Sequence, residues 1–220
     1  VPKNLAIEDK WILSKYNDLV KDVTDSLEKF ELGLAVQKLY DFIWDVFCDW
    51  YIEIAKIRLN GECATAKATV KAVLVYVMSN TLKLLHPFMP FITEELWQHL
   101  EERKDGDSIM TSLISSPKSI NSAILDSMEN AKEIIIGVRS VRASKNIANK
   151  EVLTLNVLGD YVECEQTIIT KLANLDSSNI VTDKDASAAS FMVGTTEFNV
   201  PLANNIDIDF PVEGFTTSYK

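Results

Sequence analysis

The chain contains few of the residues that interrupt regular secondary structure or staple small folds. Its 220 residues include only 7 glycines, 6 prolines and 3 cysteines. Because 47% of the residues are hydrophobic and no low-complexity run is present, the composition is that of a globular, helix-rich protein. Cys48, Cys63 and Cys164 lie far apart without CxxC spacing, which indicates reduced thiols in a cytoplasmic protein rather than disulfides or a zinc site.

The sequence also lacks the patterns of a self-contained active site. It has no Gly-rich phosphate loop, no HExxH motif and no Ser, His and Asp set, and His86 and His99 have no metal-ligating partner nearby in sequence. No apolar run reaches about 20 residues and no leader peptide opens the chain. We therefore predict no catalytic residue, no metal site and no membrane partner. The start at Val1 rather than Met leads us to expect a piece of a longer protein.

Apolar residues recur at helical spacing over most of the first two thirds of the chain. This periodicity predicts long helices over residues 9–29, 34–59, 64–85 and 121–143, with a short helix in residues 93–100. Asp9 and Thr93 stand where N-caps are expected, and Pro87 should end the third helix near Leu85. Helices joined by modest loops predict an antiparallel bundle.

The period changes after the last long helix. Residues 153–159 alternate like a strand, residues 161–173 are typical of a helix, and residues 190–202 have hairpin character around Gly194 and Thr195. We therefore predict a mainly α protein with a boundary near residues 144–152. Residues 1–143 would form the helical bundle and residues 144–220 a small α+β domain with an irregular tail.

One predicted helix carries an unusual stripe of carboxylates and aromatic rings. Asp41, Asp45, Asp49 and Glu53 stand four residues apart, which favours a solvated face paired with Lys38 and Lys56. Two other interpretations stay open: Asp49 or Glu53 orienting a basic side chain, and a carboxylate pair for acid–base catalysis. The neighbouring aromatic residues are predicted to be mainly core, with Trp44 at the edge of the apolar stripe, and an exposed ring could stack an unpaired base. They are Tyr40, Trp44, Phe47, Trp50 and Tyr51.

Basic residues are outnumbered 22 to 32, giving a net charge of −10, which excludes a general basic coat for nucleic acid. Against this background Arg139, Arg142, Lys145 and Lys150 form a local cationic cluster. Cations in the last turns of a helix are favoured by its dipole, and a guanidinium can also bind phosphate or a base edge with two hydrogen bonds. Both interpretations stay open.

Four stretches of sequence together resemble a known family. They are EDKWILSKYNDLV, LYDFIWDVFCDWYIEIAK, LLHPFMPFITEELWQ and IIIGVRSVRASKNI. In this order they resemble the C-terminal part of the valyl-tRNA synthetases, over about residues 5–205. FCDWYIE and HPFMPFITEELW are more similar to the valyl branch than to the isoleucyl or leucyl enzymes.

The resemblance implies that residues 1–143 are the anticodon-binding domain of a class I synthetase. The parent enzyme would join valine to tRNA(Val) with ATP and Mg, but the HIGH and KMSKS motifs are absent here. Catalysis and cofactor binding would thus belong to a missing catalytic domain, and this piece would be inactive alone. Its implied partners are tRNA(Val) and the missing catalytic and editing domains of the same chain. Members commonly continue into a basic coiled coil, whereas residues 204–220 here are typical of an irregular tail.

For contacts with the anticodon stem and loop we predict two sets of basic residues. The first set is Arg139, Arg142 and Lys145, and the second is Lys15, Lys56 and Arg58. Two alternatives remain: the equivalent region of an isoleucyl-tRNA synthetase, and a helical module whose acidic surface binds a protein and never touches RNA.

Overall fold

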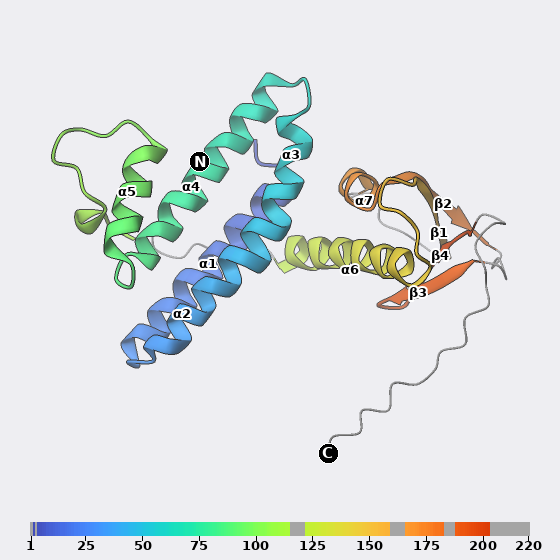
Figure 1. Ribbon diagram of the computed structural model, residues 1–220, viewed down its shortest axis with the longest axis horizontal. Helices are drawn as coiled ribbons and strands as arrows, with labels where there is room; N and C mark the ends of the chain where they lie inside the picture. Colours follow the sequence, from blue (N-terminus) through green and yellow to red (C-terminus); the bar gives the residue numbers. More distant parts are fainter. Residues whose placement is uncertain (1, 3, 115–121, 159–165, 183–187, 203–220) are drawn as a thin grey trace, which may run out of the picture. The chain divides into compact units, whose positions relative to one another are not determined.

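The computed structural model describes residues 2, 4–114, 122–158, 166–182 and 188–202 (Figure 1). These residues form two compact units that divide between Lys132 and Glu133. The division falls inside the last long helix, whereas the sequence predicted a boundary after it. The first unit is helical, and the second combines the end of that helix with a small sheet.

The helical unit consists of helices that follow one another along the chain. They are α1 (Ile7–Glu28), α2 (Leu32–Asp41), η1 (Phe42–Ile52), α3 (Glu53–Leu59), α4 (Ala64–Leu85), α5 (Pro90–Leu100), the short η2 (Ile109–Thr111) and the start of α6 (Ser122–Ser144). The continuous helical segment from α2 to α3 runs antiparallel to α1, and α4 runs antiparallel to that segment (Figure 1). Because α4 contacts α1, α2, α3 and α5, it is the central helix, and the predicted antiparallel bundle is confirmed.

The apolar stripe of α1 forms much of the core of this unit. Trp11, Ile12 and Val23 are fully buried, and Tyr16 is 1% exposed. Fully burying one large apolar side chain contributes about 1.5 to 3 kcal/mol. The 3.6-residue period of α1 therefore determines which face meets α2 and α4.

Both predicted N-caps were wrong. α1 begins at Ile7, and Asp9 lies inside its first turn, where its carboxylate accepts the N–H of Ala6 at 3.1 Å. α5 begins at Pro90, because a proline ring is compatible with the first turn of a helix. Thr93 is buried within α5, and its hydroxyl donates to the carbonyl of Met89 at 2.8 Å.

The helix predicted over residues 34–59 is continuous but not uniform. Its middle third, η1, is a π-helix, flanked directly by α2 and α3. π-Helical segments are rare and occur often at functional sites. The wider turns of η1 change which side chains share a face, so a simple four-residue stripe does not describe this segment.

α4 is long and apolar enough to cross a membrane by length and composition alone, and 44% of its most apolar window is buried inside the protein. It carries Lys67, Lys71 and Lys83. Since a core helix of a bundle passes the same test, the packing of α4 against four other helices accounts for its composition.

The second unit contains a four-stranded sheet in the order β2-β1-β4-β3. Its elements after α6 are β1 (Leu153–Leu158), α7 (Gln166–Leu172), β2 (Leu175–Val181), β3 (Ala189–Val193) and β4 (Thr196–Val200). β1 and β2 are parallel and joined through α7, while β4 is antiparallel to both β1 and β3. The predicted small α+β region is therefore confirmed, with Gly194 at φ +57° in the predicted hairpin turn.

The sequence did not predict β2, and some predictions fall outside the described residues. Cys164, the start of the helix predicted over 161–173, and the tail at 204–220 are among these. α6 reaches the sheet through Gly137, where an added Cβ would lie 2.3 Å from the ring of Phe191. That ring stacks on Phe198 with centroids 5.5 Å apart, so the end of α6 and the sheet share one core.

Candidate nucleic-acid interface

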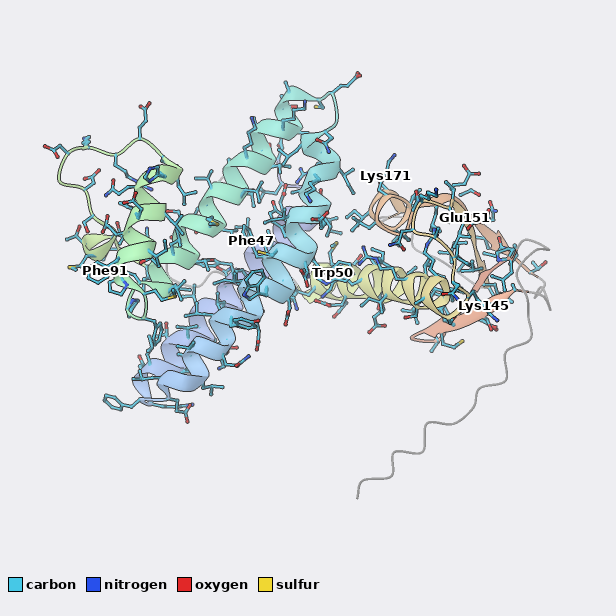
Figure 2. All side chains as sticks on the ribbon, viewed as in Figure 1. Phe47, Trp50, Phe91, Lys145, Glu151 and Lys171 are labelled. Atoms are coloured by element: carbon cyan, nitrogen blue, oxygen red, sulfur yellow. The ribbon has the colours of Figure 1, made fainter. Side chains whose placement is uncertain are left out.

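Two aromatic side chains are exposed where α2 passes into η1. Tyr40 is 57% exposed and Trp44 is 52% exposed, and their ring centroids lie 6.3 Å apart. Phe47 and Tyr51, further along the same helix, are buried, and their ring centroids lie 6.1 Å apart. Figure 2 labels Phe47. The core prediction is thus confirmed for Phe47 and Tyr51 and wrong for Tyr40, while Trp50 is half-buried and Trp44 is exposed at the edge of the apolar stripe. An exposed aromatic pair is a platform on which an unpaired base can stack.

The carboxylate stripe beside these rings lies toward solvent. Asp41, Asp45 and Asp49 are exposed and Glu53 is half-buried. Gln37 donates to Asp41 at 2.6 Å, and Lys56 pairs with Glu53 at 2.5 Å. The prediction of a solvated, partly ion-paired face is confirmed, except that Lys38 pairs with Asp22, at 3.9 Å.

Arg58 lies in a polar junction between α3 and the start of α1. Its Nε lies 2.8 Å from Glu8, and its guanidinium also contacts Asp9, which is fully buried. Tyr51 donates its hydroxyl to Asp9 at 2.8 Å. Burial raises the pKa of Glu8, and Arg58 opposes that shift. Arg58 therefore compensates the negative charge of two buried carboxylates, those of Glu8 and Asp9.

Lys15 is held by a second polar junction, between α1 and the start of α6. Its ammonium lies 2.8 Å from Glu129, which Lys132 also contacts at 2.9 Å. Burial raises the pKa of Glu129, but the two lysines lower it by more. Lys132 in turn lies over the rings of Trp11 and Trp50, at 5.5 and 5.2 Å. This junction fixes the helices against each other.

Arg142 is almost completely buried, at 4% exposed. Its guanidinium donates to four backbone carbonyls, those of Ala148, Glu151, Ala173 and Asn174, at 2.8 to 3.1 Å. These carbonyls belong to the loop after α6 and to the turn that precedes β2. The sequence predicted Arg142 as a leading phosphate contact, whereas the structure uses its donors to join two loops.

Arg139 and Lys145 are the more accessible members of the same cluster. Arg139 is exposed, and its guanidinium donates to the carbonyl of Leu172 at 3.3 Å. Lys145 directly follows α6, is half-buried and forms no ion pair with any described residue (Figure 2). Lys56 is also accessible, with 54% of its side chain exposed. The three remain predicted RNA contacts.

The six predicted basic residues are divided between the two units. Lys15, Lys56 and Arg58 belong to the helical unit, and Arg139, Arg142 and Lys145 to the α+β unit. Sequence reasoning also missed a group of cations in the helical unit, formed by Lys71 and Lys83 on α4 and Arg103 after α5. The signal available was the excess of lysine on the otherwise apolar α4. Among the described residues no cluster of His, Cys, Asp or Glu could hold a metal ion.

The family described as the anticodon-binding domain of tRNA ligase matches residues 9–157. The chain belongs to this family. The match covers the helical unit and runs into β1, so the exposed Tyr40 and Trp44 and the cluster around Arg139 lie within the anticodon-binding domain. The accessible side chains described above are thus candidate RNA contacts of such a domain.

Curated relatives agree with this assignment. A valine–tRNA ligase of Parabacteroides distasonis is 43% identical over 208 residues, which is 94% of this chain and 24% of the relative. One of Bacteroides thetaiotaomicron is 42% identical over 96% of this chain and 24% of its own length. One of Bacillus subtilis is 36% identical over 93% and 24%. The chain spans about a quarter of the length of the curated relatives it matches.

Proposed function

We propose that this chain is the anticodon-binding region of a valine–tRNA ligase and that it recognises the anticodon stem and loop of tRNA(Val). The observation that carries the proposal is the family match over residues 9–157, joined with relatives that are named valine–tRNA ligases. The same relatives favour the valyl enzyme over the isoleucyl alternative.

Recognition by such a region is physical rather than chemical. The bases of a single-stranded loop leave their stack and are read on their hydrogen-bonding edges or stacked on aromatic and guanidinium planes. Tyr40 and Trp44 supply an exposed aromatic surface, and Arg139, Lys145 and Lys56 supply accessible positive charge. The net charge of −10 would repel unspecific RNA and confine binding to these places.

Catalysis belongs to other domains in this proposal. A catalytic domain elsewhere in the parent polypeptide would bind ATP with Mg and valine, and an editing domain would accompany it. This chain would place the distant acceptor end of the tRNA by holding the anticodon arm. The whole enzyme would act in cytoplasmic protein synthesis.

The proposal is tested by the affinity of the 220-residue chain for fluorescently labelled tRNAs, measured by anisotropy at a fixed salt concentration. tRNA(Val) should bind more tightly than tRNA(Ile) and more tightly than an unrelated tRNA. Preference for tRNA(Ile) would favour the isoleucyl alternative. Equal, weak binding of all three would favour a helical module that recognises protein rather than RNA.

A further inference from the structure

A cleft opens in the helical unit between α4 and the segment that follows α5. It encloses about 590 Å³. Its polar lining consists of Lys71, Tyr76, Ser79, Asn80 and Lys83 on α4, with Glu101 and Arg103 opposite. Among the described residues, three cations and one carboxylate line the cleft, in a chain whose net charge is −10. This local excess of positive charge favours an anionic ligand.

Arg103 is held in one orientation at the edge of this cleft. Its guanidinium carbon lies 3.5 Å from the centroid of the Trp97 ring, and Nη2 lies 3.0 Å from Glu101. Trp97 is anchored in a small core with Leu82 and Ile109. The Nε of Arg103 is buried and has no hydrogen-bond partner among the described residues. An incoming anion would be stabilised by the charge of the guanidinium, whose Nη atoms can donate hydrogen bonds to it.

Lys83 faces the same cleft from α4. Its ammonium donates to the carbonyl of Leu113 at 3.2 Å, which uses one of its three donors. Burial lowers the pKa of Lys83, and the positive charge of Arg103 lowers it further. An anion between the two cations would oppose both effects. Lys71 lies twelve residues earlier on α4, about 18 Å along the helix axis.

Phosphate oxygens suit this lining better than an apolar or a cationic partner does. Positive side chains together with Ser, Asn and Tyr side chains are the groups that contact RNA phosphates and sugars. We propose that the cleft binds the sugar–phosphate backbone of tRNA, with Lys83 and Arg103 at one phosphate and Lys71 at another. This inference rests on the proposed function for the choice of tRNA as the ligand, and it adds a backbone contact to the reading of the anticodon.

The test compares the salt dependence of tRNA(Val) binding for the unmodified chain and four variants. Lys83→Gln and Lys71→Gln should each weaken binding roughly fivefold and lower the slope of log affinity against log salt by about 1. Lys83→Arg keeps the charge and should retain the slope. Lys21→Gln removes an exposed charge on α1 that does not line the cleft, and it should leave the slope unchanged.

The outcomes separate this inference from the proposed function. If the unmodified chain prefers tRNA(Val) but Lys83→Gln and Lys71→Gln keep its affinity and slope, the cleft is not an RNA site and the proposed function stands. If the chain shows no preference among tRNAs but the slopes still fall, the proposed function fails and the backbone site stands. Should Lys83→Gln unfold in circular dichroism, the exposed Lys71→Gln decides.

Discussion

The basic residues of this protein differ in the partners that the fold gives them. Arg58 in the helical unit and Arg142 in the α+β unit are enclosed, one by carboxylates and the other by backbone carbonyls. Lys83 and Arg103 line a cleft with one carboxylate among the described residues, and Arg103 pairs with the exposed Glu101 rather than with buried carboxylates. The comparison teaches that a cluster of basic residues in sequence does not identify an RNA surface. What matters is how many donors the fold has already used.

The strongest test of this comparison is removal of Arg58. Arg58→Ala leaves the buried Asp9 and Glu8 without their cation, and removing one partner of a buried ion pair costs about 3 to 5 kcal/mol. Trp11, Trp44, Trp50 and Trp97 all lie in the helical unit, so urea unfolding followed by tryptophan fluorescence reports on this unit. The exposed Lys56→Ala is the control, with an expected change within about 0.5 kcal/mol. A loss below about 1 kcal/mol for Arg58→Ala would contradict the enclosed role.

The next test concerns Arg142. Arg142→Ala leaves four backbone carbonyls without their donor and should destabilise the α+β unit by about 3 kcal/mol. Amide hydrogen exchange in β1 and β2 measures this effect without interference from the helical unit. Arg139→Ala, three residues earlier and exposed, should leave that exchange almost unchanged. Equal effects of the two substitutions would remove the distinction between enclosed and accessible arginines.

Exposed aromatic residues extend the comparison to tRNA binding. Trp44→Ala should weaken tRNA(Val) binding by about 1 to 3 kcal/mol, the contribution of one base–aromatic stack, with little change in stability. Anisotropy titration measures the first quantity and urea unfolding the second. Phe91→Ala is the matched control, because Phe91 is 90% exposed on α5, away from α2 and η1 (Figure 2). Equal losses for both variants would argue against a specific platform at Trp44.

The smallest expected effect is a local pH dependence where α5 contacts η2. Hydrogen bonds from Ser108 and Gln98 lower the pKa of Glu94, whose carboxylate also accepts the N–H of Ile109 at 3.1 Å. Because the folded-state pKa is lowered, this stabilisation is present above the ordinary glutamate pKa of about 4.3 and is lost as the pH falls through the folded value. Exchange protection of the Ile109 amide should therefore persist at neutral pH and decline only at a pH below the ordinary glutamate pKa.

Glu94→Gln provides the control for that titration. The amide cannot ionise, so the protection of Ile109 should become independent of pH over the same range. A decline that persists in Glu94→Gln would assign the titration to another group.

The helices were predictable because their buried apolar residues recur with the period of an α-helix. The apolar stripe of α1 alone places Trp11, Ile12 and Tyr16 in the core, and the structure buries all three. Helix ends were less predictable. Both Pro90 and Thr93 are residue types that favour the start of a helix, and α5 begins at Pro90, whose ring is compatible with the first turn. The π-helical form of η1 has no signal in a pattern based on 3.6 residues per turn.

The candidate site was predictable only in part. Arg139 and Arg142 have the same residue type and neighbouring positions, yet only the return of the loop near Ala148 and the turn near Ala173 encloses Arg142. The contacts with Ala173 and Asn174 join residues 31 and 32 apart in sequence and leave no local pattern. For the same reason, the sequence did not predict the cleft that brings Arg103 close to Lys83. That cleft depends on the packing of α5 on α4.

The most direct test of the central claim is an exchange of anticodon loops between tRNA(Val) and an unrelated tRNA. The dissociation constants of the 220-residue chain for both chimaeric tRNAs would be measured at one salt concentration. Our account predicts that tight binding follows the valine anticodon loop into the unrelated tRNA. Affinity that stays with the body of tRNA(Val), whatever loop it carries, would contradict anticodon recognition by this chain.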